Sequence, residues 1–399
     1  MVSWTDLLSI RAHKKQNKLR YSLRKGSLVP RIVVWNITSR CNLRFRHCYY
    51  SSSDRSSLEE LNLEEARNFV SDLSVLKVHT LLFSGGEPLL KPDIFALAKF
   101  AKTRGIKVAL STNGTLIDSR AAREIKNSGF SYVGISLDGM EKSNDTFRQA
   151  KGAFKKSLQG IRNCKKIGLA VGLRFTLTRY NSRDLPEIFS LVERERVHRF
   201  CIYHLAYVGR GSNLREMDLS HLERRRALEL IWQKTKEFLK NKLNIEVLTV
   251  DNHADGAWVY MKLKKLDPQR AHLALEILKV QGGNSAGIKI ASVDDCGNIY
   301  ADQFLRSYPL GNIRIKKFSQ AWLGPDNSLL SALRNRMPYL PERCRRCSFI
   351  KICNGNFRAR IEAVSGNLWQ DDPACYLTEE EIHQDAEVYS SLDCAGVNA

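Results

Sequence analysis

The sequence lacks long apolar runs. No stretch of its 399 residues approaches the 18 consecutive apolar side chains that suggest a membrane-spanning helix. The segment Met1-Val2-Ser3-Trp4 does not begin the charged-then-apolar pattern of a secretory signal. Internal repeats and low-complexity tracts are also missing. We therefore expect a globular protein of the cytoplasm that has no membrane partner.

Acidic residues are scarce relative to basic ones. Asp and Glu number 42 against 63 Lys and Arg, which gives a formal net charge of +21. Such an excess could attract nucleic acid, acidic lipid or a polycarboxylate substrate. Because the basic residues are spread along the chain rather than grouped on a recognisable module, the sequence argues against nucleic acid. A merely basic protein with none of these ligands is the alternative.

Cysteine is present in quantity, with ten residues in an expected reducing compartment, where stable disulfides are disfavoured. Four are clustered as Cys344-x2-Cys347-x5-Cys353 with Cys375 further on. This clustering favours a metal centre, and its spacing suits zinc and iron–sulfur equally well. Three isolated cysteines are expected to be structural: Cys164, Cys201 and Cys394.

Apolar runs alternate with amphipathic stretches over the first half of the chain. The predicted strands are 32–37, 80–83, 107–110, 132–136, 171–178 and 200–205. Helices are predicted between them, the first capped by Asn62 with Glu65 closing a capping box. This order predicts an α/β protein with right-handed crossovers and one parallel sheet. We expect a basic arm at 1–30, a barrel at 31–211, a helical connection at 212–285 and a cysteine-rich region at 286–399.

Polar loops follow four successive predicted strands. They read Cys41-Asn42-Leu43-Arg44-Phe45-Arg46-His47-Cys48, Gly85-Gly86-Glu87-Pro88, Ser111-Thr112-Asn113-Gly114 and Ser136-Leu137-Asp138-Gly139. Each loop alone is weak evidence, because glycine-rich turns after strands are common. The carboxyl ends of parallel strands meet on one rim, so the four loops together predict a ligand-binding site there.

The first two loops resemble the signature of the radical S-adenosylmethionine (SAM) superfamily, Cys-x3-Cys-x-aromatic-Cys followed by Gly-Gly-Glu-Pro. The resemblance covers Val33 to about Leu205 and implies a partial (β/α)6 barrel. It makes Cys41 and Cys48 ligands of a 4Fe–4S cluster that carries SAM on its open iron. It also implies the SAM contacts: Gly85, Gly86 and Glu87 at the amino group, Ser111, Asn113, Ser136 and Asp138 along the ribose and methionine, His47 at adenine and Arg174 at the carboxylate.

The chain departs from the signature at Phe45, where the superfamily has its second cysteine. A phenyl ring cannot ligate iron, so two thiolates would leave one cluster iron without its protein ligand. Either the site is degenerate, the chain is an altered copy of an active enzyme, or another ligand is recruited. We expect Phe45 to impair SAM cleavage severely.

Beside a radical SAM barrel, the C-terminal cysteines are similar to the auxiliary-cluster region of the SPASM/twitch type. By that likeness Cys344, Cys347, Cys353 and Cys375 would hold a second 4Fe–4S cluster. By the same likeness Cys296 is a candidate for a further ligand, and a lone thiol is the alternative there.

Further stretches resemble the radical SAM proteins of haem d1 biosynthesis over nearly the whole chain, among them Tyr207-Val208-Gly209-Arg210-Gly211 and Asp372-Pro373-Ala374-Cys375-Tyr376-Leu377. This resemblance implies 12,18-didecarboxysiroheme as a polycarboxylate tetrapyrrole substrate, loss of two propionates, and a low-potential electron donor such as ferredoxin or flavodoxin. Arginine suits a polyanionic ring. The candidate substrate contacts are Arg148, Arg210, Arg306, His204 and His253.

Three alternatives stay open. One is a related haem-pathway enzyme that acts on a siroheme-derived ring. Another is a SPASM enzyme that modifies a peptide, which predicts a peptide-recognition domain before the barrel; the thirty residues of the basic arm are too few for a usual one. The last is a catalytically silent tetrapyrrole-binding protein, which Phe45 favours.

Overall fold

One mixed sheet forms the body of the protein in the computed structural model, which describes residues 1–9 and 28–383. Within these residues the strand order is β1-β8-β7-β6-β5-β4-β3-β2-β9-β10-β11. The six predicted strands are all present and pair in parallel: β2 (Ile32–Asn36), β3 (Thr80–Ser84), β4 (Lys107–Thr112), β5 (Val133–Ser136), β6 (Val171–Leu177) and β7 (Arg199–His204).

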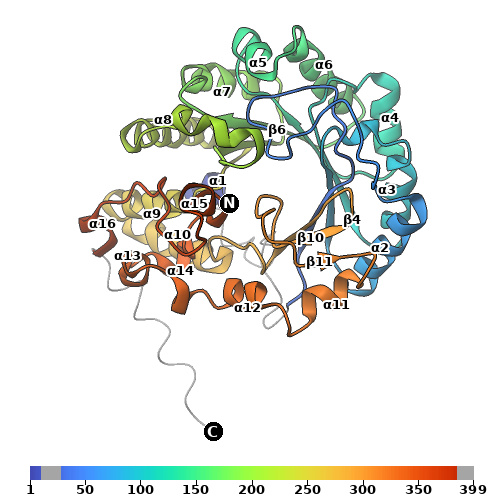
Figure 1. The fold of residues 1–399 in the computed structure, drawn as a ribbon. Helices are drawn as coiled ribbons and strands as arrows, with labels where there is room; N and C mark the ends of the chain where they lie inside the picture. Colours follow the sequence, from blue (N-terminus) through green and yellow to red (C-terminus); the bar gives the residue numbers. More distant parts are fainter. Residues whose placement is uncertain (10–27, 384–399) are drawn as a thin grey trace.

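Helices cover the outer face of this curved sheet (Figure 1). They are α2 (Leu63–Val75), α3 (Ile94–Thr103), α4 (Ser119–Asn127), α5 (Glu141–Arg148), α6 (Ala153–Lys166) and α7 (Leu185–Arg194). The predicted capping box of α2 is present, with Asn62 and Glu65 each accepting from the other's backbone. The buried stripe of α2 contains Ala66, Phe69, Val70 and Leu73, as its spacing predicts. The α/β partial barrel is thereby confirmed.

One edge of the sheet corrects two expectations. Strand β8 (Glu246–Val250) pairs in parallel with β7, so the connecting region is not wholly helical. Strand β1 (Val2–Ser3) pairs antiparallel with β8, and α1 (Trp4–Leu8) follows it. Trp4 and Leu7 are fully buried. Residues 2–8 are therefore part of the core rather than of an arm, because their apolar side chains cover the end of the barrel.

The other edge belongs to the C-terminal part of the chain. Strand β9 (Ile290–Val293) pairs in parallel with β2, and β10 (Asn298–Tyr300) and β11 (Gly311–Asn312) continue the sheet as antiparallel strands. The sheet thus crosses the predicted boundary at residue 285 without a break. The residues after 285 therefore extend the barrel sheet beyond β2.

The remaining helices flank the opening between the two sheet edges. They are α8 (His221–Lys240), α9 (Ala254–Leu266), α10 (Pro268–Gln281), α11 (Phe318–Leu323), α12 (Ser328–Arg334), α13 (Glu342–Arg346), α14 (Ile350–Cys353), α15 (Arg358–Ser365) and α16 (Glu379–His383). Short 3₁₀ turns lie at Pro88–Leu90, Ser182–Asp184, Gly209–Met217 and Met337–Tyr339. Figure 1 shows α13 to α16 gathered beside α9 and α10.

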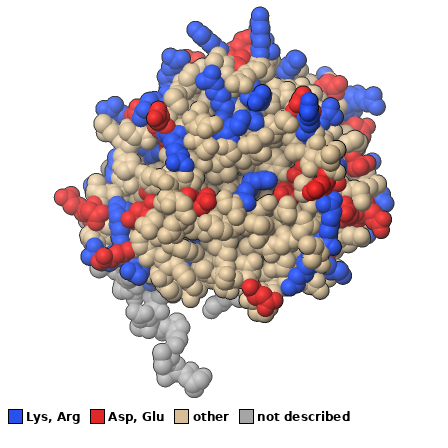
Figure 2. All heavy atoms as spheres, viewed as in Figure 1, with Lys and Arg blue, Asp and Glu red and all other residues tan. Residues whose placement is uncertain are grey.

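Surface charge is mixed on the face seen in Figure 2, where Lys and Arg are interspersed with Asp and Glu. None of the described helices is long and apolar enough to cross a membrane. Cys164 and Cys201 are buried in α6 and β7. The third cysteine expected to be structural, Cys394, lies outside the described residues.

Candidate functional site

The loop after β2 and the glycine loop after β3 are in direct contact. The Gly86 N–H donates to the Thr38 carbonyl at 2.7 Å, and the Glu87 N–H donates to the Arg40 carbonyl at 2.8 Å. A Cβ on Gly86 would lie 2.1 Å from the Arg40 oxygen, so only glycine permits this approach. Cys41 follows Arg40 directly and is buried. The fold therefore brings the thiol loop and the Gly-Gly-Glu loop together, as the strand order predicts.

Glu87 supports these loops from within. It is fully buried, and its carboxylate accepts from the Thr112 hydroxyl at 2.7 Å and the Asn113 N–H at 2.8 Å. Burial raises its pKa to about 7, against the opposing effect of these hydrogen bonds. Gly85 and Gly86 line the adjoining cavity, whereas Glu87 does not. These contacts join β3 to the loop after β4, and the predicted contact of Glu87 with a SAM amino group stays a prediction.

The thiol loop holds two buried cysteines and one aromatic ring. Burial raises the pKa of Cys41 to about 12, with Glu87 and Cys48 acting in the same direction. The ring of Phe45 lies 5.6 Å from that of His47 and 4.8 Å from the guanidinium carbon of Arg148. Phe45 thus occupies the middle of the loop with a cation–π contact, and it faces the cavity.

Behind this loop lies a buried ion pair. Arg148 is fully buried and donates from Nε to Asp138 Oδ2 at 2.8 Å. His47 Nε2 lies 3.5 Å from the same oxygen, and its ring stacks on Phe147 at 4.8 Å. Burial disfavours the Asp138 charge, but Arg148 and His47 outweigh it and lower the Asp138 pKa. Asp138 therefore orders the loop through Arg148 and His47, and its predicted place along the ribose and methionine of SAM stays a prediction.

The inner ends of β4, β5 and β6 present polar groups to the barrel interior. Arg174 donates from Nη1 to the Ser111 hydroxyl. A Cβ on Gly134 would lie 2.5 Å from Arg174 Nε, so this glycine makes room for the guanidinium. Burial alone would lower the Arg174 pKa, but nearby phenols, that of Tyr203 foremost, raise it. Four of the predicted SAM contacts line the same cavity: Ser111, Asn113, Ser136 and Arg174.

Two adjoining cavities occupy the barrel interior, and they share wall residues that include Val34, Leu82, Arg174, Tyr203, Asp251 and Gln303. The upper cavity reaches Phe45 and His47 at the rim, and the lower one reaches Lys107 and Lys289. Several buried nitrogen atoms have no hydrogen-bond partner: Arg148 Nη1, Arg174 Nε, Arg210 Nη2 and His47 Nδ1. Buried donors are normally paired, so these atoms indicate an anionic ligand.

The other predicted substrate contacts are largely engaged within the protein. Arg210 donates to the carbonyls of Phe45 and Ser52 at 2.9 and 2.7 Å, which fixes the thiol loop. Arg306 covers the Tyr50 ring at 4.1 Å. His204 Nε2 lies 2.8 Å from Asp255 Oδ2 in a buried pair, although the residue borders the upper cavity.

His253 lines the lower cavity. Its Nε2 lies 2.9 Å from the Met1 amino group. Burial lowers the His253 pKa, so the ring is neutral. Its Nδ1 is buried without a hydrogen-bond partner, and of the five predicted contacts four keep such a nitrogen: Arg148, Arg210, Arg306 and His253.

The four C-terminal thiols lie around α13 and α14. Arg343 Nη1 donates to Cys375 Sγ at 3.5 Å, and Cys344 Sγ donates to Asp371 Oδ1 at 3.7 Å. Burial raises the pKa of Cys353, and Cys375, Cys344 and Cys347 raise it further, which places all four thiols in one electrostatic environment.

The spacing of these thiols does not identify the metal that they would bind. Tetrahedral zinc with Zn–S bonds of about 2.3 Å holds its sulfurs about 3.8 Å apart. Among the described residues, the only group with three such ligand atoms within 4.8 Å of one another is Asp294, Asp295 and Cys296. Zinc and a 4Fe–4S cluster therefore both stay open for the four thiols.

A buried arginine faces this thiol set. Arg358 is fully buried, and its Nη1 donates to the Leu368 carbonyl at 2.8 Å. Its Nε and Nη2 have no partner. Burial lowers the Arg358 pKa, while Cys344 and Cys353 act in the opposite direction. A cation with free donors beside four cysteines fits an anionic cluster, so these residues could hold one.

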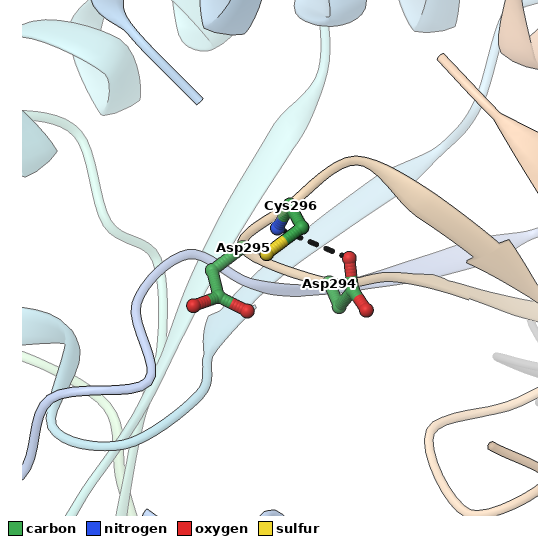
Figure 3. A group of neighbouring side chains, drawn as sticks. All are labelled: Asp294, Asp295 and Cys296. Atoms are coloured by element: carbon green, nitrogen blue, oxygen red, sulfur yellow. Dashed lines mark hydrogen bonds between the residues drawn. The ribbon is translucent and has the colours of Figure 1, made fainter. Parts of the chain in front are cut away.

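Cys296 lies apart from the other cysteines, in the turn between β9 and β10 (Figure 3). Asp294 Oδ1 accepts from the Cys296 N–H at 3.1 Å, and Asp294 Oδ2 accepts from Tyr300 at 3.0 Å. Asp295 accepts from the Tyr50 hydroxyl. These contacts account for the three residues as a hydrogen-bonded turn, and Cys296 is a lone thiol near Ser57.

Comparison with known proteins agrees with this architecture. Residues 35–192 match the Radical SAM superfamily. The chain is 48% identical over 354 residues to the Fe-coproporphyrin III synthase of Methanosarcina barkeri, covering 88% of this chain and 89% of that one. It is 41% identical over 360 residues to the pre-heme d1 synthase of Dinoroseobacter shibae, covering 90% and 88%.

A parallel partial barrel whose rim joins a cysteine loop to a Gly-Gly-Glu loop defines a radical SAM enzyme scaffold. This chain belongs to the radical SAM superfamily, and its relatives place it among the haem-synthesis enzymes of that superfamily. Solved structures share the fold. SuiB of Streptococcus suis superposes with a TM-score of 0.69 at 18% identity, covering 92% of this chain and 78% of that one. The anSMEcpe structure superposes with a TM-score of 0.65 at 19% identity, covering 86% of this chain and 93% of that one.

The superfamily implies a 4Fe–4S cluster and SAM, and the residues present fit the two groups unequally. The unpartnered nitrogens of Arg148 and Arg174 suit an anionic ligand such as the SAM carboxylate. The cluster needs three thiolates, and this loop supplies Cys41 and Cys48 with a phenyl ring between them. The cluster-binding loop therefore does not fit the cluster of its superfamily.

Several wall residues escaped prediction from the sequence. Tyr203, Gln303 and Asp251 border both cavities. The signal for Tyr203 was available, because Arg199, Cys201 and Tyr203 alternate along β7 and all face inward. Asp251 and Gln303 lie in loops far along the chain, so only the tertiary fold brings them to the interior.

Proposed function

We propose that this chain is a haem-synthesis radical SAM protein whose barrel binds 12,18-didecarboxysiroheme, and that its reaction, the removal of carboxylated side chains from this ring, is impaired by Phe45. The observation that carries the proposal is 48% identity over nearly nine-tenths of both chains with an enzyme named for its product, Fe-coproporphyrin III.

The barrel interior supports a polycarboxylate ligand. Arg174 and Lys107 contribute positive charge to the cavity walls, and Arg174 retains an unpartnered Nε. A guanidinium binds carboxylate through paired hydrogen bonds, which are stronger in a dry cavity than in water. The apolar side chains of Val34, Leu82 and Phe304 offer surface to the ring itself. Charge and apolar surface are thus combined as a tetrapyrrole requires.

The remaining assignments follow from the same family. The cavity-lining residues Gly85, Gly86, Ser111, Asn113, Ser136 and Arg174 would contact SAM, and His47 would face its adenine. Cys344, Cys347, Cys353 and Cys375 would hold an auxiliary 4Fe–4S cluster, which would supply electron transfer when bound. Radical SAM enzymes need a reductant, and ferredoxin or flavodoxin would serve here.

Ring binding tests the proposal directly. Titration of the purified chain with 12,18-didecarboxysiroheme, followed by visible absorbance, should show saturable binding. Arg174→Gln should weaken that binding about tenfold or more, because it removes a charge-assisted contact. Arg179→Gln is the matched control, since Arg179 is half exposed and pairs with Glu223 outside the cavity. Absence of saturable binding would rule the proposal out.

The product identifies the reaction. Incubation of the Phe45→Cys form with the ring, SAM and dithionite should give a compound of the mass of Fe-coproporphyrin III. The second candidate is the pre-haem d1 reaction, which the 41% identity to the Dinoroseobacter enzyme favours. A product lacking two propionates would assign the chain to that route instead.

A further inference from the structure

The thiol loop keeps its shape although it lacks one thiol. Its backbone is held at Phe45, whose carbonyl accepts from Arg210 Nε at 2.9 Å, and at Arg46, whose N–H donates to the Phe147 carbonyl at 3.2 Å. Arg210 also donates its backbone N–H to the Cys48 carbonyl at 3.0 Å. The substitution has therefore removed a ligand atom without removing the scaffold around it.

The ring of Phe45 is packed against neighbouring side chains at the position where the signature has a cysteine. Its ring contacts Arg148 at 4.8 Å and His47 at 5.6 Å, and the aromatic row continues through Phe147 to Tyr180. A phenyl ring has no lone pair to offer iron. It also covers apolar and cationic surface that a smaller thiolate would leave open.

Other potential ligands near the loop are already engaged. His47 is held between Asp138 and the Phe147 ring. The Tyr49 hydroxyl donates to Asn36 Oδ1 at 2.8 Å, and Tyr50 donates to Asp295. Each would have to leave a buried partner to reach iron, which would leave that partner unsatisfied.

We propose that the thiol loop of this chain does not hold a stable 4Fe–4S cluster, and that the chain binds anionic ligands in its barrel without cleaving SAM. Two thiolates leave two irons of a four-iron core without protein ligands, one more than SAM occupies. The unpartnered nitrogens of Arg148 and Arg174 remain available in the cavity. Phe45 therefore removes cluster binding from the loop, while the groups that bind an anion in the cavity stay in place.

Iron and sulfide counts after anaerobic reconstitution test this inference. Phe45→Cys should contain about four more irons and four more sulfides per chain than the native protein. Phe45→Ala is the matched control: it removes the ring without adding a thiol, and it should match the native count. With dithionite as electron source, only Phe45→Cys should convert SAM to methionine and 5′-deoxyadenosine.

Cys41→Ser keeps the test decisive if Phe45→Cys folds poorly. In the native background this change should leave the iron count unaltered, because Cys41 holds no cluster. A loss of about four irons from native protein on Cys41→Ser would overturn the proposal. So would SAM cleavage by the native chain at the rate of Phe45→Cys. Neither result bears on ring binding, so failure here is distinct from failure of the proposed function.

Discussion

Two sets of thiols lie in the described part of the chain, and they differ in the number of cysteines. At the barrel rim, the buried Cys41 and Cys48 flank Phe45, and the nearby cation Arg148 is paired with Asp138. In the C-terminal region there are four cysteines, and the buried Arg358 beside Cys344 and Cys353 has free Nε and Nη2 atoms. The rim shows that loop geometry can persist when a ligand is lost. The C-terminal region offers the four thiols that the proposed auxiliary cluster needs, with a positive charge beside them.

The largest expected effect comes from removing one thiol from each set. Cys353→Ser should abolish nearly all bound iron, because one of the four ligands of the proposed auxiliary cluster is lost. Cys41→Ser should change the iron content little. Iron analysis of both variants beside native protein makes the comparison, and equal losses would show that the two regions do not differ as described.

Replacing the buried arginine of each region should lower the free energy of unfolding by a different amount. Arg148→Met leaves Asp138 as a buried charge and should cost about 3–5 kcal/mol of unfolding free energy. The double variant Arg148→Met with Asp138→Asn should recover part of that loss. Urea unfolding of metal-free protein measures both.

Arg358→Met should cost less than Arg148→Met in metal-free protein, since Arg358 donates to backbone carbonyls and leaves no hydrogen-bonded carboxylate behind. In cluster-loaded protein it should lower the reduction potential, because a positive charge near the cluster is lost. An unchanged reduction potential in a redox titration would show that the charge of Arg358 does not act on the cluster.

Between the two regions, Asp251 should make stability depend on pH. Burial raises its pKa from 3.8 to about 7. The folded state then keeps a proton that the unfolded state releases, so this contribution to stability is greatest below pH 4 and declines as the pH rises to 7. Asp251→Asn should flatten that decline, and asparagine tolerates the local φ of +66°. Thermal unfolding from pH 4 to 8 measures the slope, and an unchanged slope would contradict the assignment.

The smallest effect is expected for Phe45→Leu, which keeps apolar volume but loses the cation–π contact with Arg148. Unfolding free energy should fall by about 0.5–1 kcal/mol, with no change in iron content. A loss of iron on this change would mean that the ring supports a cluster after all.

Local sequence signals predicted the barrel well. Apolar runs located β2 to β7, and the Asn62 capping box located the start of α2. Strand β8 was missed because Glu246–Val250 is a short run between long charged helices. The strands β9 to β11 were missed because β9 joins the sheet by pairing with β2, more than 200 residues away in the chain, and β10 and β11 extend the sheet from β9.

The site was predicted in its loops but only partly in its side chains. Motif spacing brought Cys41, Gly86 and Asn113 to one rim, since strand ends fix the backbone. The roles of Glu87 and Asp138 could not be predicted, because which carboxylate faces a cavity and which faces a partner depends on packing. Arg148 pairs with Asp138 only because α5 returns across the end of β5.

Electron paramagnetic resonance of the dithionite-reduced native protein, recorded with and without SAM, tests the central claim most directly. One cluster at Cys344, Cys347, Cys353 and Cys375 should give a single signal that SAM leaves unchanged. A second signal that shifts when SAM is added would place a cluster at Cys41 and Cys48. It would contradict the claim that the loop with Phe45 does not bind a cluster.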